Sequence, residues 1–565
     1  MPIIFYRALL LAADTAAIDA LCEALAVRGL APAPLAVTSL KEGKARAFVR
    51  DALARLQPAV IVTTTAFAAG GEPGEPNPLD GPDVPVLQAV IATTKRAAWR
   101  DHPRGLGAAD LAMHVVLPEL DGRVLAGAIA FKDTLSPPQP SPASGWSTEE
   151  GLAFTAVTNR PELDRVDAVA ERVAALVRLQ AKPRGERRIA VLMPDYPGAP
   201  GRAGYAVGLD VPASVLALLT DLAEAGYQVR DAPQTSRALL DALEEGRATA
   251  CLPLDAYAGL LADLPPAAVA KIREAWGDPG GDPDVRDGSF CFRATRCGNA
   301  IVALPPDRGR AANRRADYHD PALPPCHALV AFALWLRHVE KIDALVHMGA
   351  HGTLEWLPGK AVALTPACFP EAILGALPVF YPFIVSNPGE AAQAKRRIAA
   401  VTIGHLPPPL VTTPLPGEAR DLERLVDEYV QADGLDRRRR ERLARLIVEN
   451  ARRSGLAREA GIEAEADADT ALRRIDAWLC DLKDLAIKDG LHVYGRAPSP
   501  LTEWGDNGGG APSGDHLPLE GGCRPAPAGR VGVTAVPQVR PLRHPTPPPP
   551  YPPPQAGGTG RGRPS

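Results

Sequence analysis

Residues 342–360 read IDALVHMGAHGTLEWLPGK, and this stretch decides how the middle of the chain folds. Its apolar start, Ile342 to Val346, has the length and composition of a buried β-strand. A helical pattern from Cys326 to Val339 precedes it, and an apolar run from Ala300 to Leu304 precedes that helix. A strand, a helix and a second strand in succession form the crossover unit of a parallel sheet. The stretch therefore predicts an α/β domain with His347 at the carboxyl end of a strand.

The same alternation extends over most of the chain. Further strands are predicted at residues 3–6, 59–63, 84–91, 188–193 and 400–403, and further helices at 14–28 and 210–225. The pattern indicates several Rossmann-like units, in which a parallel sheet is flanked by helices.

The chain divides into four predicted parts. We expect an N-terminal α/β domain over residues 1–182, a central α/β domain that carries the motif over 183–410, and a helical segment over 411–498. From residue 499 onward glycine, proline and arginine dominate and the aliphatic periodicity ends. Residues 499–565 are therefore predicted to be a disordered and non-native tail.

Composition excludes several classes of protein. The chain has 62 basic and 66 acidic residues, so no basic excess indicates nucleic-acid binding. Eight cysteines without a Cys-x-x-Cys pair argue against a zinc site and a disulfide scaffold, which favours a reduced, cytoplasmic protein. No apolar run is long enough to span a membrane. No phosphate-binding glycine loop is present, so we expect no bound nucleotide in this chain.

Two histidines and a glutamate follow the central strand at spacings of four residues. His347, His351 and Glu355 stand out because the chain has only 11 histidines in 565 residues. Gly349 and Gly352 argue against one continuous helix, so we expect a strand-end loop and a short turn. Imidazoles and carboxylates bind metal ions and transfer protons near neutral pH. The three are predicted to be catalytic and metal-binding; the alternative is a hydrogen-bonded loop without a ligand.

A second polar set follows a predicted strand, turn and helix. Asn387 lies in an Asn-Pro-Gly turn, and Glu390 falls in the first helical turn. Lys395, Arg396 and Arg397 come next along the helix. Arginine binds carboxylates through two parallel hydrogen bonds, so these cations are candidate anchors for an acidic ligand. The alternative interpretation is that Lys395, Arg396 and Arg397 are solvated cations on a helix face.

The remaining candidates lie in the motif and in loops. They are Trp356, Lys360 and Arg202 as substrate-binding residues, and His319, Asp320 and His405 as supporting residues. Arg202 belongs to a Gly/Pro-rich loop after a predicted strand, which is equally consistent with an ordinary surface loop. Trp356 suits either packing on a flat ring or a place in the core.

The motif resembles that of a known family. Residues 347–360 are similar to the signature of the large, porphyrinoid-binding subunits of ATP-dependent chelatases, which comprise CobN and the H-type subunit of magnesium chelatase. YPFIVSNPGE at 381–390, KRR at 395–397 and GHLPP at 404–408 resemble the cobalt branch. The magnesium branch has an Asn-Asn-Pro-Ser-Glu version there. The similarity extends to about residue 498, and family members are longer at both ends, so we interpret the chain as a truncated fragment.

The resemblance implies a reaction. It implies the tetrapyrrole-binding subunit of an ATP-dependent cobaltochelatase, a ligase that inserts Co²⁺ into hydrogenobyrinic acid a,c-diamide in aerobic cobalamin biosynthesis. ATP would be hydrolysed by AAA+ partner subunits resembling CobS and CobT. Glu355 would act as base or metal-delivery ligand, with His347 and His351 as metal relay or second base. These side chains would have to line a cavity wide enough for the ring.

Three alternatives stay open at this point. One is the H-type subunit of a magnesium chelatase, which inserts Mg²⁺ into protoporphyrin IX. Another is a non-catalytic tetrapyrrole-binding fragment. The third is a stand-alone metal-dependent hydrolase that uses His347, His351 and Glu355 as a three-ligand site.

Overall fold

The computed structural model describes most of the first 459 residues and a few short segments beyond them. The described residues are 1–70, 77–134, 157–194, 204–206, 209–309, 320–350, 352–382, 384, 388–404, 417–432, 437–459, 462, 471–472, 475, 479 and 492–496. The predicted tail at 499–565 lies outside them.

The N-terminal part contains a six-stranded sheet in the order β2-β1-β3-β4-β5-β6. The strands are β1 (Pro2–Tyr6), β2 (Ala33–Val37), β3 (Ile61–Thr63), β4 (Val86–Lys95), β5 (Val124–Thr134) and β6 (Val157–Pro161). Neighbouring strands are parallel except β5 and β6. The helices are α1 (Arg7–Leu11), α2 (Ala16–Val27), α3 (Gly43–Leu56), α4 (Arg96–Asp101), α5 (Ala108–Asp110), η1 (Leu111–Val116), α6 (Leu117–Glu119) and α7 (Leu163–Ala181).

The central part contains a second six-stranded sheet, in the order β13-β14-β7-β15-β16-β17. Its strands are β7 (Ile189–Leu192), β13 (Arg293–Cys297), β14 (Ala300–Leu304), β15 (Ala344–His347), β16 (Val379–Pro382) and β17 (Val401–Ile403). Only β13 is antiparallel to its neighbour in this sheet. The fold class is therefore confirmed, with an antiparallel edge strand in each sheet that the sequence patterns did not indicate.

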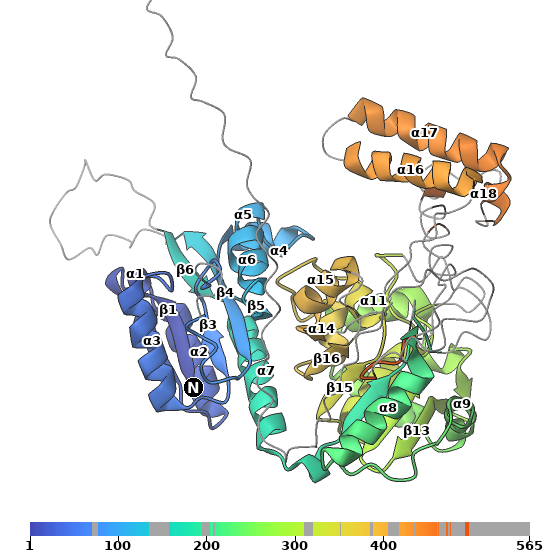
Figure 1. Cartoon of the computed structure of the whole chain (residues 1–565), viewed down its shortest axis with the longest axis horizontal. Helices are drawn as coiled ribbons and strands as arrows, with labels where there is room; N and C mark the ends of the chain where they lie inside the picture. The colour runs from blue at the N-terminus through green and yellow to red at the C-terminus, as the bar shows by residue number, and fades with distance from the viewer. Residues whose placement is uncertain are drawn as a thin grey trace, which may run out of the picture. The chain divides into compact units, whose positions relative to one another are not determined.

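Helices cover both faces of the central sheet (Figure 1). They are α8 (Val211–Glu224), α9 (Ser236–Glu245), α10 (Leu254–Ala262), α11 (Pro266–Trp276), α13 (His327–Leu334), α14 (Phe369–Leu374) and α15 (Pro388–Arg397). Side chains of a strand alternate between faces, so Val191 packs under α8 and α9 while Leu192 packs under α13. Every residue of α13 is buried, which explains why its sequence is almost wholly apolar.

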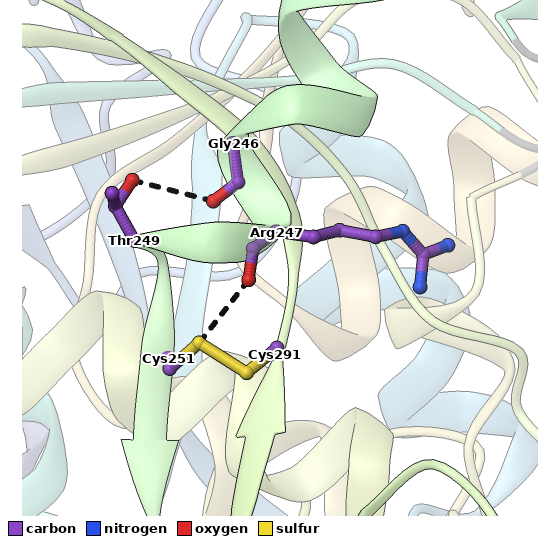
Figure 2. The surroundings of a disulfide bond; sticks show 5 residues. All are labelled: Gly246, Arg247, Thr249, Cys251 and Cys291. Atoms are coloured by element: carbon purple, nitrogen blue, oxygen red, sulfur yellow. Dashed lines mark hydrogen bonds between the residues drawn. A yellow bond between two sulfur atoms is a disulfide. The ribbon is translucent and has the colours of Figure 1, made fainter. Parts of the chain in front are cut away.

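A small antiparallel sheet lies beside the central one and carries a disulfide bond. Its strands are β10 (Cys251–Pro253), β11 (Val285–Arg286) and β12 (Ser289–Cys291). Cys251 and Cys291 lie directly opposite each other on β10 and β12 and are joined through their sulfurs (Figure 2). The cysteine spacing argued against a disulfide scaffold and did not indicate this single pair. A cross-strand pair separated by 40 residues has no local sequence signature.

Residues 360–397 contact the N-terminal part through several buried polar groups. Glu371 of α14 accepts hydrogen bonds from Arg165 and Arg172 of α7. The indole Nε1 of Trp99 donates to the carbonyl of Ala363 at 2.8 Å. Val362 and Ala363 also join a hydrophobic cluster of the N-terminal sheet. Residues 360–397 therefore pack against the N-terminal part as well as against the central sheet.

A helical hairpin follows the central sheet. It consists of α16 (Gly417–Ala432), α17 (Arg437–Arg453) and α18 (Leu456–Glu459). Its own core contains Leu422, Ile447 and Ile475, which lie in the predicted helical segment 411–498. Beyond it, residues 492–496 return to the central part, because the amide of Asp210 donates to the carbonyl of His492 at 2.9 Å. The exact four-part division at 182, 410 and 498 stays a prediction.

No helix among the described residues is long and apolar enough to cross a membrane.

Candidate active site

His347 lies at the topological switch point of the central sheet. It is the last residue of β15, and β15 pairs with β7 in parallel so that His347 is opposite Leu192. From β7 the chain goes first to β14 on one side and later to β15 on the other. Ligands of open α/β sheets bind outside the carboxyl ends of the strands at such a point. The predicted location of His347 is confirmed.

Glu355 lies in a short helical turn, as predicted, and is fully buried. The turn η7 comprises Leu354–Trp356, and the side chain of Thr353 makes no capping hydrogen bond to it. Glu355 is 1% exposed. Gly352 packs directly on its carboxyl group, because a Cβ atom added to Gly352 would lie 2.6 and 2.7 Å from the two carboxyl oxygens. Position 352 therefore requires glycine, because a side chain there would collide with the carboxyl group of Glu355.

Tyr381 connects the two predicted residues. The ring of Tyr381, on the neighbouring strand β16, lies 4.4 Å from the imidazole ring of His347, measured between centroids. Its hydroxyl donates to Oε1 of Glu355 at 3.2 Å and accepts from the amide of Gly352 at 2.9 Å. The structure therefore joins an imidazole, a phenol and a carboxyl in one continuous group.

The environment of Glu355 raises the pKa of its carboxyl. Burial raises the pKa of the Glu355 carboxyl from its ordinary 4.5 to about 7, and the negative charge of Glu390 acts in the same direction. The hydrogen bond from Tyr381 and the positive charge of Arg397 act in the opposite direction. A carboxyl with a pKa near 7 both accepts and releases protons at neutral pH.

Arg397 holds the backbone around Glu355. Its Nε donates to the carbonyl of Lys360 at 3.1 Å and its Nη2 to that of Leu357 at 2.7 Å. Its Nη1 donates to the carbonyl of Glu355 itself. Arg397 is buried, and burial lowers its pKa. The guanidinium that we predicted to anchor a substrate therefore binds the protein's own turn.

Two other predicted anchors also bind groups of the protein. Arg396 forms a two-pronged pair with Glu119 of α6, at 2.9 and 2.8 Å. The buried ammonium of Lys360 donates to the carbonyls of Arg100 and His102 at 3.1 and 2.9 Å. These contacts fasten the turn to the N-terminal part and leave Lys395, which is partly exposed on α15, as the cation best placed for a ligand.

Trp356 and Asp320 are exposed to different degrees. The side chain of Trp356 is 38% exposed, directly after the buried Glu355. Asp320 is exposed, and its carboxylate accepts from the amide of Ala322 at 2.8 Å within its own turn. Predicted residues outside the described part of the chain are His351, Arg202, His319, Asn387 and His405. Their roles stay predictions.

Two of the three predicted metal ligands, His347 and Glu355, belong to the described residues, and His351 does not. Within the described residues, no three His, Cys, Asp or Glu side chains converge to hold a metal ion. The cavity that His347 borders has a volume of about 20 Å³, which is room for about one water molecule. This cavity, which Leu192, Leu345 and Leu354 also line, is too small for the ring.

Tyr381 was not among the predicted site residues, although a signal for it existed. It lies near the end of the strand that follows β15 in sequence and pairs with it in parallel. Consecutive parallel strands end at the same sheet edge, so a polar residue there is a neighbour of His347.

Known proteins are similar to this chain over most of its length. The family model described as CobN/Magnesium Chelatase matches residues 1–503. The chain belongs to the CobN/magnesium chelatase family. The aerobic cobaltochelatase CobN protein of Pseudomonas aeruginosa is 44% identical, over 88% of this chain and 40% of the relative. The H-type subunit of magnesium chelatase from Cereibacter sphaeroides is 31% identical, over 89% of this chain and 41% of the relative.

A solved structure of the family supports the fold as well. The catalytic subunit of cobaltochelatase from Mycobacterium tuberculosis superposes with a TM-score of 0.65 at 33% identity, covering 88% of this chain and 43% of that one. The chain therefore spans about 40% of the length of the relatives that it matches.

Proposed function

We propose that this chain is part of the tetrapyrrole-binding subunit of a cobaltochelatase that inserts Co²⁺ into hydrogenobyrinic acid a,c-diamide. The observation that carries the proposal is the 44% identity to a CobN protein over 88% of the chain. Cobalt is favoured over magnesium because the identity to the H-type magnesium-chelatase relative is 31%. ATP hydrolysis by AAA+ partners resembling CobS and CobT, the ligase class and a cytoplasmic location belong to the same proposal.

Insertion of a metal ion into the ring requires removal of protons from ring nitrogens, and Glu355 is our candidate base. Its pKa of about 7 suits proton acceptance at neutral pH. Tyr381 is a positioning residue for this base, since its hydroxyl donates to the carboxyl and its ring packs against the imidazole of His347. The exposed indole of Trp356 offers a flat surface for the macrocycle next to the turn.

Glu355 is sealed in this arrangement, so contact with the ring requires the turn at 352–356 to move. Cobalt enters as a substrate ion, for which imidazole and carboxylate are suitable ligands. His347, His351 and Glu355 are proposed as its delivery ligands on the way to the ring.

The test is reconstitution with partner subunits, ATP, cobalt and the macrocycle, followed by absorption spectroscopy. Glu355→Gln is expected to lower the rate of metal insertion by roughly 100-fold or more while macrocycle binding, measured by fluorescence quenching, changes by less than about threefold. Glu245→Gln, which alters an exposed carboxylate at the end of α9, serves as the matched control. Normal insertion by Glu355→Gln would remove Glu355 from the chemistry.

A further inference from the structure

Arg337 presents one edge of its guanidinium to the end of a helix. It lies in the π-helical turn η6 (Trp335–Val339), which continues α13. Its Nη1 donates to the carbonyls of Ala372 and Ile373, at 3.3 and 2.7 Å, in the last turn of α14. Cations are favoured at helix carboxyl ends because free carbonyls are concentrated there. This contact uses only one of the three nitrogens.

The other edge, formed by Nε and Nη2, has no partner in the described part of the chain. Among the residues that the structure describes, no carboxylate pairs with Arg337, and neither nitrogen makes a hydrogen bond. The group is half-buried, and burial lowers its pKa. By contrast, the buried guanidiniums of Arg165 and Arg172 both pair with Glu371. A partly buried charge without a counter-ion is costly, so an anion that reached this edge would be stabilised.

Arg337 lines a cavity of about 280 Å³. The cavity lies between α7 and the amino-terminal ends of β15 and β16, and its walls include Arg178, His338, Asp343 and Leu377. This is the opposite end of the strands from His347, so the cavity is separate from the candidate active site.

Gly375 packs against the face of the guanidinium. A Cβ atom at this position would lie 2.6 Å from Nη2, 3.0 Å from Cζ and 3.5 Å from Nε of Arg337, which places it above the plane of the group and not at the Nε–Nη2 edge. The backbone of Gly375 also has a φ of +61°, which favours glycine. A side chain at position 375 would therefore displace the guanidinium from its present place.

The acidic residues of the cavity wall are neutralised by cations of their own. Asp343 accepts from Lys182 at 2.6 Å. Glu171 accepts from Arg28 at 2.8 Å and from Arg178 at 2.7 Å. These pairs leave Arg337 as the positive group of the wall whose charge is not matched within the described residues.

We propose that the cavity is a binding site for a small oxyanion, a phosphate or a carboxylate group, held side-on by Nε and Nη2 of Arg337. A guanidinium edge presents two parallel N–H groups at the spacing of two oxygens of such an anion. The volume admits the anionic group and a few further atoms, which is the lower end of the range for small-molecule sites. This site is independent of the proposed chelatase function.

The experiment is a titration of the whole chain with inorganic phosphate and, separately, with acetate, at ionic strength matched by sodium chloride. Calorimetry and the melting temperature are the readouts. Saturable binding of either anion is expected, and comparison of the two arms identifies the preferred oxyanion. Arg337→Gln is expected to weaken binding by about tenfold or more.

Arg178→Gln is the matched control, since it removes a guanidinium of the same cavity that is already paired with Glu171; a change of less than about twofold is expected. Gly375→Ala keeps the charge but forces the guanidinium to move, because the added carbon would lie 2.6 Å from Nη2, and it is expected to weaken binding. The proposal is overturned if wild-type protein responds to phosphate and acetate no more than to chloride, or if folded Arg337→Gln binds as tightly as wild type. Because the wild-type titration decides by itself, failure of a variant to fold does not leave the proposal untested.

Discussion

The hydroxyl of Tyr381 lies 3.2 Å from Oε1 of Glu355, in the interior of the protein and at the carboxyl edge of the central sheet. This contact supplies the buried carboxyl with a hydrogen-bond donor while its surroundings keep its pKa at about 7. Substitutions of Glu355, Tyr381, Gly352 and Arg397 change this contact or the structure that supports it.

Glu355→Gln should stabilise the fold at alkaline pH. The folded-state pKa of about 7 exceeds the ordinary 4.5, so folding retains the proton and stability falls as pH rises between these values. The loss is complete above a pH of about 7, where the substitution should raise the free energy of unfolding by up to about 3 kcal/mol. Urea unfolding at about pH 5 and about pH 8 measures this.

Glu371→Gln provides the control of opposite sign. Burial raises the pKa of Glu371, but Arg172 and Arg165 outweigh this effect and lower it overall. Removal of this carboxylate takes the shared negative charge from Arg165 and Arg172 and should cost about 3 kcal/mol. Equal effects of the two substitutions under alkaline conditions would contradict the environment that we assign to Glu355.

Tyr381→Phe should raise the pKa of Glu355 further, because the carboxylate loses a hydrogen-bond donor. The lower limb of the pH profile of metal insertion is expected to move to higher pH, and stability should fall by about 1 kcal/mol. Tyr257→Phe is the control: this buried tyrosine bonds His327 at 2.8 Å, so its loss should reduce stability without moving the profile. If the pH profile of Tyr381→Phe is not shifted, the phenol of Tyr381 does not influence the protonation of Glu355.

Gly352→Ala should impair metal insertion strongly. The added methyl carbon would lie 2.4 Å from the hydroxyl of Tyr381 and within 2.7 Å of both carboxyl oxygens of Glu355. One of these groups must move, so a loss of about tenfold or more in the insertion rate is expected. Gly404→Ala, where nothing lies within 4 Å of the added carbon, should keep the wild-type rate. Steady-state kinetics of metal insertion by both variants tests this difference; equal rates would contradict it.

Arg397→Gln should be more damaging than Arg396→Gln. Arg397 donates to three carbonyls of the 355–360 turn, so its loss should lower the free energy of unfolding by about 3 kcal/mol. Arg396 pairs with Glu119 closer to the surface, and about 1 kcal/mol is expected there. Thermal or urea unfolding compares them; the reverse order would show that the turn does not depend on Arg397.

Cys251→Ser should lower stability in oxidising buffer by about 4 kcal/mol, because the disulfide closes a loop of 40 residues. Dithiothreitol should destabilise wild type by a similar amount and leave the variant unchanged. Cys22→Ser removes a free, partly exposed thiol and should have little effect. If dithiothreitol does not change the unfolding of wild type, the pair contributes nothing to stability.

The sequence predicted the features that local pattern controls. Apolar periodicity and glycine placement predict the strand before His347, the turn around Glu355 and the helix that contains Leu422. What it did not reveal depends on contacts between distant segments. Arg397 was interpreted as a ligand anchor because a row of cations gives no sign that one of them turns inward to three carbonyls.

Tyr381 and the disulfide illustrate two kinds of omission. Tyr381 was identifiable once β15 and β16 were taken as parallel neighbours. The Cys251–Cys291 pair was not, since the register that opposes them belongs to a small sheet whose strands are only two or three residues long. The sequence did not reveal the burial of Glu355 either, because a carboxyl is usually exposed and is buried only where distant segments surround it.

The hydroxyl of Tyr494 donates to the carbonyl of Gly404 at 3.1 Å, across 90 residues of sequence. The excursion that contains the helical hairpin thus leaves the central sheet and rejoins it beside the end of β17. α16, α17 and α18 have a hydrophobic core of their own, so a short graft that keeps His405 would replace these three helices and leave every strand of the central sheet in place.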